Sequence, residues 1–130
     1  MKPGRPNQDF HAIDTVSGFE PRPGGVDGIT QKILGDDFDP ARRKGSRTRL
    51  LRMAPGCETP EAHAHDYFEE LYILEGDLIA IDGPGRQRRF EAPSFACRAP
   101  GAMHGPVRTE TGCLMLEFAW YPDGKDGETA

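Results

Sequence analysis

Glycine and proline interrupt this chain at short intervals along most of its length. The 130 residues include 16 glycines and 12 prolines, which end helices and mark turns. The apolar runs between them are short, recur about every ten residues and show no helical period of useful length. We therefore expect an all-β sandwich or barrel of many short strands.

Apolar runs and turn signals place the expected strands and their connections. The strands are predicted at residues 28–34, 46–53, 69–74, 77–82, 93–99, 104–109 and 113–120. Glu75-Gly76 stands between two apolar runs and predicts a hairpin, while Gly83-Pro84-Gly85 and Glu110-Thr111-Gly112 predict further turns. The sequence thus predicts a meandering antiparallel arrangement.

The length suits a single domain. Residues 1–27 are polar and rich in proline and glycine, so we expect an N-terminal arm. Residues 28–120 hold the predicted strands and would form the barrel, and residues 121–130 would form a polar C-terminal tail.

Charge and cysteine content limit the possible partners and compartment. The net charge of −5 gives little attraction for nucleic acid or anionic membranes. No apolar run approaches the ~20 residues of a spanning helix, and the N-terminus lacks the apolar core of a secretory signal. Three widely spaced cysteines, Cys57, Cys97 and Cys113, favour a reducing compartment. We expect a cytoplasmic protein without nucleic-acid or membrane partners.

Three of the four histidines occur with a glutamate in a pattern that suits a metal site. On a strand, His63 and His65 would point to the same face, about 6.6 Å apart along the chain. Two imidazoles at that spacing can converge on one ion at ~2.1 Å. Glu69 has the same strand parity, and His104 follows a Pro-Gly turn that could bring it alongside. Glu70, with the opposite parity, is the competing carboxylate.

The chemistry of these ligands predicts a divalent transition metal. Imidazole together with carboxylate suits Fe, Mn, Zn, Ni or Cu. In an octahedral ion, four protein ligands leave two positions open, as Lewis-acid or oxygen chemistry requires.

The segment from Gly56 to Gly76 resembles the first motif of the cupin superfamily, which is Gly, five residues, His-x-His, three or four residues, Glu, six residues and Gly. Here three residues separate His65 from Glu69, and six separate Glu69 from Gly76. Six residues rather than five follow Gly56. Pro100-Gly101-Ala102-Met103-His104 resembles the second motif, Pro-x-Gly-x-x-His-x-x-x-Asn, with Arg108 in place of its asparagine.

The resemblance implies a cupin-type double-stranded β-helix, or jelly-roll barrel, with the metal in its mouth. It also implies the metal ligands His63, His65, Glu69 and His104. Residues 100–106 and 112–118 are similar to small cupins related to acetylacetone-cleaving dioxygenases. This similarity implies an Fe(II) enzyme that cleaves a small 1,3-dicarbonyl or hydroxyketone-like substrate chelated to the metal, although Zn, Mn or Ni would also fit.

Two other functions remain open on the same scaffold. The His-x-His-x-x-x-Glu-Glu pattern also resembles the sensor domain of zinc-dependent, ChrR-like anti-sigma factors, which implies metal or oxidant sensing without turnover. A metal-dependent isomerase or decarboxylase is the third possibility.

Further side chains are candidates for the substrate pocket. Tyr67 and Phe68 precede Glu69 and could wall the site. Arg49 and Arg98 lie on predicted strands and would anchor an anionic or enolate substrate if they point inward. Phe118 is a candidate for the pocket, the core or a dimer contact.

Apolar residues on one predicted strand face suggest self-association. Tyr72, Leu74 and Leu78 would form an exposed patch if they point outward. We therefore expect a homodimer in which a twofold partner covers this patch.

Overall fold

The chain folds into strands and loops around one core, as the sequence predicts. The computed structural model describes residues 4–81 and 84–122. In these residues the secondary structure consists of β1 (Glu20–Pro21), β2 (Ile29–Asp36), β3 (Ser46–Met53), β4 (Phe68–Ile81), β5 (Gln87–Glu91), β6 (Ser94–Arg98), β7 (Val107–Arg108) and β8 (Cys113–Trp120). The part of the chain that is described contains no helix able to cross a membrane.

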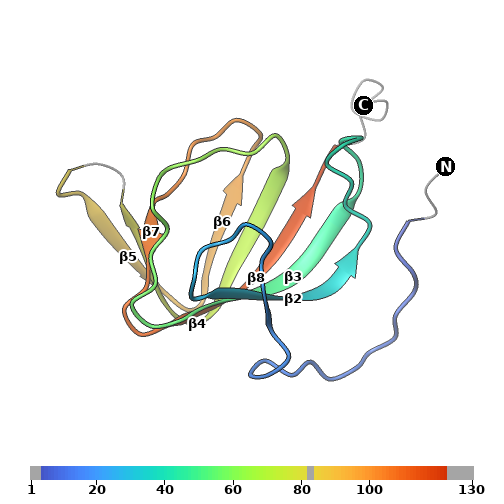
Figure 1. Cartoon of the computed structure of the whole chain (residues 1–130), viewed down its shortest axis with the longest axis horizontal. Coiled ribbons are helices and arrows are strands. Elements are labelled where there is room, and N and C mark those ends of the chain that lie inside the picture. The colour runs from blue at the N-terminus through green and yellow to red at the C-terminus, as the bar shows by residue number, and fades with distance from the viewer. Residues whose placement is uncertain (1–3, 82–83, 123–130) are drawn as a thin grey trace.

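All strand pairs are antiparallel, and β4 connects the two layers of the jelly roll. The sheet order is β1-β2-β3-β8-β4-β5, and β6 and β7 also pair with β4. The first half of β4 pairs with β6 and β8, whereas its second half pairs with β5 and β7. Figure 1 shows β5 and β7 as a short layer beside the larger sheet. The loops that carry His63, His65 and His104 lie at the end of the fold where β4 begins.

The predicted hairpin at Glu75-Gly76 is wrong, because β4 runs without reversal from Phe68 to Ile81. Gly76 has a φ of +83°, and the register with β8 shifts between Ile73 and Glu75. A Cβ atom on Gly76 would lie 1.9 Å from the Gly112 carbonyl oxygen. The glycine therefore marks a bulge that bends the strand from one layer into the other.

The remaining strand predictions differ in accuracy. Residues 46–53 and 113–120 form strands with the predicted bounds. The strand expected at 104–109 is reduced to β7 and an isolated bridge at His104. The sequence prediction missed β5, and β1 falls within the expected arm.

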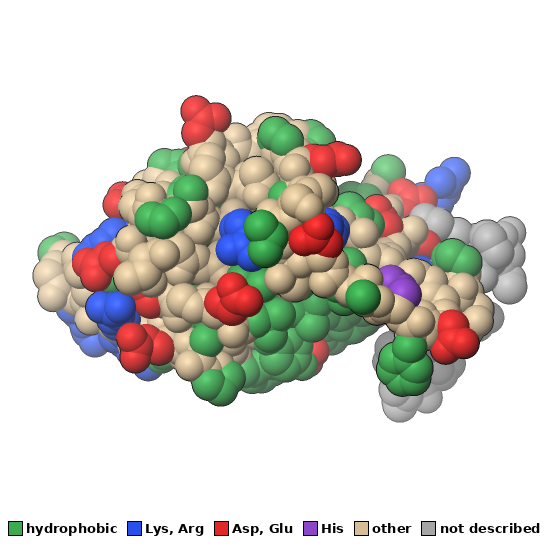
Figure 2. Space-filling model, turned by 90° about the horizontal axis from the view of Figure 1, so that it is seen from below, with side chains coloured by type: hydrophobic (Ala, Val, Ile, Leu, Met, Phe, Trp, Pro, Cys, Tyr) green, Lys and Arg blue, Asp and Glu red, His purple; other side chains and the backbone are tan. Residues whose placement is uncertain are grey.

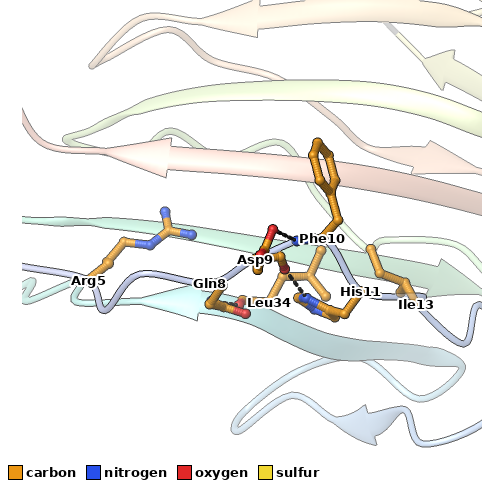
Figure 3. Close-up of a pocket in the computed structure, with 7 residues that line it drawn as sticks. All are labelled: Arg5, Gln8, Asp9, Phe10, His11, Ile13 and Leu34. Atoms are coloured by element: carbon orange, nitrogen blue, oxygen red, sulfur yellow. Dashed lines mark hydrogen bonds between the residues drawn. The ribbon is translucent and has the colours of Figure 1, made fainter.

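The N-terminal segment runs as an extended arm outside the larger sheet (Figure 1). Arg5 Nη1 donates to Thr48 Oγ1 at 3.0 Å, and Gln8 Nε2 donates to the Leu34 carbonyl at 2.9 Å. The close-up in Figure 3 shows a shallow pocket between this arm and Leu34. His11 lies there, with Nδ1 2.9 Å from the Asp9 carbonyl oxygen.

The described end of the chain also packs against the fold. Tyr121 is buried, and its backbone N–H donates to the Gly45 carbonyl at 3.0 Å. The rest of the expected tail, residues 123–130, lies outside the described residues.

The hydrophobic core fills one end of the space between the layers. Its buried members are Ile29, Leu51, Met53, Ile73, Cys113 and Met115. Leu78 packs against this cluster, so it does not join Tyr72 and Leu74 on the surface. Those two side chains are 37% and 46% exposed. Hydrophobic side chains also gather across the middle of the side seen from below (Figure 2).

Candidate metal centre

Two distant loops are joined by main-chain hydrogen bonds at the histidines. The His63 N–H donates to the His104 carbonyl at 2.8 Å, and the His104 N–H donates back at 2.9 Å. The Gly101 N–H donates to the His65 carbonyl at 2.8 Å. His63 and His65 therefore sit in the loop before β4 and not on a regular strand. The backbone bridge takes the place of the strand pairing expected from the sequence.

The three imidazoles converge on a common point. One ring nitrogen from each of His63, His65 and His104 lies within 4.8 Å of the other two. The ring centroids of His63 and His104 are 4.3 Å apart, and those of His65 and His104 are 5.1 Å apart. Nitrogens at ~2.1 Å from one ion lie at most about 4 Å apart. Small rotations of the side chains would bring the three rings into that range.

Glu69 lies beside this triad on the inner face of β4. It is 5% exposed, and its Oε1 is 3.9 Å from His65 Nε2. Oε1 of Glu69 and Nε2 of His104 are both buried without a hydrogen-bond partner among the described residues. Buried polar atoms are rarely left unpaired, so both atoms fit a bound cation. Glu70 is on the opposite face, where it accepts a hydrogen bond from the Tyr72 hydroxyl.

The electrostatics of the site favour the neutral form of His65 and His104. Burial, together with His63 and His65, lowers the pKa of His104 to about 4. Burial and the neighbouring His63 also lower the pKa of His65. A neutral imidazole has a free lone pair for a metal, so both residues are ready to bind at neutral pH.

A buried ion cluster supports Glu69 from behind. Glu117 is fully buried and receives hydrogen bonds from Arg49 Nε at 2.6 Å and Nη2 at 3.0 Å. Arg47 Nη2 adds a third at 3.0 Å. Burial raises the pKa of Glu69, and a hydrogen bond with Glu117 raises it further. Although burial opposes it, hydrogen bonds from Glu69 and Arg49 lower the pKa of Glu117. Without a metal, Glu69 is therefore protonated more readily than Glu117.

Glu117 and Arg47 are not among the site residues predicted from the sequence. A signal was present, since Glu117 has the same strand parity as the core residues Cys113 and Met115. Arg49 is its direct cross-strand partner. A charged residue on the core side of an apolar strand predicts a buried partner of opposite charge.

The structure separates the predicted pocket residues into two groups. Tyr67 stacks on His65, with ring centroids 4.6 Å apart, and Arg98 lines an internal cavity. Arg49 is inside the barrel but engaged by Glu117 and Gln31. Phe68 and Phe118 are not brought to the site. Both rings stack on Trp120, on the strand faces opposite Glu69 and Glu117.

A cavity of about 390 Å³ lies between the two layers and reaches the triad. His104 belongs both to the triad and to the cavity wall. Most of the wall is apolar, and includes Leu71, Ile73, Leu78, Phe90, Val107 and Met115. Met103 also lines the cavity and is 66% exposed. The fold therefore offers a small organic molecule an apolar space beside the three imidazoles.

Comparison with protein families gives a match that spans most of the chain. The sequence model of the ChrR cupin-like domain matches residues 14–121. A comparison with curated proteins found no match.

Solved structures share the fold at low sequence identity. An acetylacetone dioxygenase from Acinetobacter johnsonii is 20% identical, with a TM-score of 0.61 over 92% of this chain and 84% of that one. An RmlC-like cupin from Shewanella frigidimarina NCIMB 400 is 17% identical, with a TM-score of 0.63 over 92% and 96%. The polyketide cyclase RemF from Streptomyces resistomycificus is 21% identical, with a TM-score of 0.64 over 87% and 80%.

Proposed function

This chain belongs to the ChrR cupin-like domain family, and we propose that it is a metal-dependent enzyme acting on a small oxygen-containing organic molecule. Three histidines, His63, His65 and His104, and the carboxylate of Glu69 would hold one divalent transition metal. The observation that carries this proposal is the double role of His104, which is part of both the triad and the cavity wall. A molecule in the cavity would lie next to the metal.

The reaction we propose is that of an Fe(II) dioxygenase. A metal at this site would supply Lewis-acid polarisation of a chelating oxygen and, if it is iron, redox chemistry with O₂. The substrate would be a 1,3-dicarbonyl or hydroxyketone. One of its carbon–carbon bonds would break, and both atoms of O₂ would enter the products. Support comes from the ligand set and from the fold shared with an acetylacetone dioxygenase.

The residues around the metal would position its ligands and exclude water. Tyr67 packs flat against His65 and limits rotation of that ring. In the metal-free site, Glu117, fixed by Arg49 and Arg47, accepts a hydrogen bond from protonated Glu69 and so holds it beside the histidines. The apolar walls exclude water from the reacting group, which strengthens electrostatic interactions there.

Metal analysis combined with oxygen uptake tests this proposal. Protein purified without chelator should contain close to one metal ion per chain, and iron-loaded protein should consume O₂ with at least one member of a panel of 1,3-diketones. The matched control is His104→Ala taken through the same iron-loading procedure, which should consume none because it should not retain the iron. If wild-type protein fully loaded with iron consumes no O₂ with any diketone, the dioxygenase proposal is overturned.

A second candidate is a metal or oxidant sensor that does not turn over substrate. The match to the ChrR cupin-like domain favours it, because the anti-sigma factors that the sequence resembles use their cupin domain in this way. Stoichiometric zinc in the purified protein and no O₂ uptake after iron loading would favour the sensor. A metal-dependent isomerase or decarboxylase would instead convert substrate without consuming O₂.

A further inference from the structure

We propose that the substrate, besides the oxygen atoms that chelate the metal, carries a carboxylate that binds Arg98, and that its apolar part fills the space between the layers. This inference rests on the proposed function, because it assigns a substrate class to the same site. It adds an anion-binding group, separate from the metal ligands, that orients the substrate.

Arg98 is an inward-pointing cation that the fold itself does not use. It is the last residue of β6 and lies directly opposite Glu69 of β4. Cβ atoms of such cross-strand pairs are about 5 Å apart. No ion pair between these two side chains occurs within 4.0 Å, and Arg98 Nε is buried without a hydrogen-bond partner among the described residues. The guanidinium therefore has donors free for a ligand.

The Nε atoms of Arg22, Arg47 and Arg52 are also buried without a hydrogen-bond partner among the described residues, so the contrast with Arg98 lies in the other guanidinium nitrogens of Arg47 and Arg49. Arg49 directs three hydrogen bonds to Glu117 and Gln31, and Arg47 donates to Glu117. These two side chains are held by groups of the protein itself. A partly buried guanidinium without such a partner is costly, so Arg98 fits a role in ligand binding better than a role in stability.

The cavity wall supplies no counter-ion of its own. Of the described residues that line it, Arg88 and Arg98 carry a positive charge, and none is an aspartate or glutamate. Arg88 lies over the Phe90 ring, with its guanidinium carbon 5.2 Å from the ring centroid. The Ser94 hydroxyl is already donated to the Glu91 carbonyl at 2.6 Å. An anion would thus complete the charge balance of this wall.

The shape and polarity of the cavity define the rest of the ligand. A volume of about 390 Å³ suits a small molecule. Its apolar walls offer few partners for a polyol such as a sugar, whereas an aliphatic or aromatic group would bury apolar surface there. The planar fork of a guanidinium matches a carboxylate with two parallel hydrogen bonds. A carboxylate with an apolar body is the ligand that satisfies all three features.

Hexanoate and hexan-1-ol are suitable probes, because they share a chain length and differ in charge. Their binding to metal-free wild-type protein would be measured by titration of backbone amide NMR signals. We expect hexanoate to bind at least tenfold more tightly than hexan-1-ol and to shift signals from β6 and the cavity wall. Equal binding of the two probes, or no binding of hexanoate, would overturn the inference.

Variants then test whether Arg98 is the side chain responsible for the preference for hexanoate. Arg98→Gln should weaken hexanoate binding at least tenfold and leave hexan-1-ol unchanged, while Arg98→Lys should retain part of the affinity. The matched control is Arg86→Gln, which removes the same charge from an exposed residue outside the cavity. If the two glutamine variants bind hexanoate equally, Arg98 is not the anchor. Circular dichroism would confirm folding, and the probe comparison on wild-type protein stands without any variant.

Failure of this inference can be distinguished from failure of the proposed function. If wild-type protein holds stoichiometric metal but shows no preference for hexanoate, only the inference that a carboxylate of the ligand binds Arg98 is contradicted. Protein that prefers hexanoate but binds no metal contradicts the metal-dependent reaction and leaves the anion site in place. Arg98→Gln should keep the metal content of the wild type, because Arg98 is not among the proposed ligands.

Discussion

His63 and His104 form an isolated antiparallel bridge in which each N–H donates to the other's carbonyl, at 2.8 and 2.9 Å. Their ring centroids are 4.3 Å apart. Because main-chain atoms make the bridge, it does not depend on either imidazole. The site is therefore assembled by the backbone, and the ligand side chains can be changed without separating the loops.

Replacing His104 by alanine should remove the metal and leave the fold intact. Loss of one ligand should lower metal affinity by more than about 100-fold, beyond the typical effect of losing an outer-shell partner. Metal content after dialysis and thermal unfolding of the metal-free protein would be measured together. His11→Ala is the control, since His11 lies on the arm and should leave the metal content unchanged. Full retention of metal by His104→Ala would show that His104 is not a ligand.

Gly76→Ala should destabilise the protein strongly. A Cβ atom there would meet the Gly112 carbonyl oxygen at 1.9 Å, and the φ of +83° is unfavourable for alanine. We expect a loss of about 2 kcal/mol or more in the free energy of unfolding, measured by urea denaturation. Gly101→Ala is a matched control, because its φ is +82° but a Cβ atom there meets nothing within 4 Å. Equal losses in the two variants would mean that the contact with Gly112 is unimportant.

The strands that the sequence predicted accurately are those with clear local limits. β3 is followed at once by Ala54-Pro55-Gly56, and β8 follows Glu110-Thr111-Gly112. The hairpin predicted at Gly76 was wrong because a glycine with positive φ occurs both in turns and in bulges. Pairing with β8, near Gly112 and far along the chain, decides between them. That information is not local to the sequence around Gly76.

Part of the candidate site, like part of the fold, could be predicted from the sequence. The spacing of the histidines and Glu69 indicated that they would lie together, and the three imidazoles do converge. The cluster around Glu117 was harder to predict, because it requires the register of β3 against β8. Likewise, only the packed structure shows that Arg49 is already occupied while Arg98 lines the cavity.

We propose that the chain forms a homodimer through β4 and β6. Phe95, Leu74 and Tyr72 are 57%, 46% and 37% exposed, and the rings of Tyr72 and Phe95 are 4.9 Å apart. Among the described strands, β6 pairs with β4 alone, so its other edge is open. An apolar patch beside an open edge suits a twofold contact with a second copy.

Light scattering tests the dimer. Wild-type protein should have twice the chain mass of 14.3 kDa, and Phe95→Glu should shift it to the monomer, because a charge would be buried in the contact. Phe10→Glu introduces the same charge on the arm, at a fully exposed side chain, and should leave the mass unchanged. A monomeric wild-type protein would exclude the proposed contact.

Asp77→Asn should destabilise the end of the barrel opposite the histidines, and the effect should depend on pH. Asp77 is 1% exposed and accepts hydrogen bonds from Thr109 Oγ1 at 2.9 Å and Thr111 Oγ1 at 2.6 Å. Losing the charge should cost about 2 kcal/mol at pH 7, measured by urea denaturation of metal-free protein. Glu20→Gln, an exposed change of the same charge on β1, should cost almost nothing.

The sign of the pH dependence follows from the same contacts. Although burial opposes it, the hydrogen bonds from Thr111 and Thr109 lower the pKa of Asp77 below its ordinary value of 3.8. The folded state thus binds this proton less readily than the unfolded state, so the stabilisation is complete above pH 3.8 and is lost as the pH falls towards the folded pKa. The difference in stability between wild type and Asp77→Asn should stay constant from pH 5 to 7 and narrow below about pH 4. A difference that widens in acid would mean that Asp77 is already protonated in the folded protein at neutral pH.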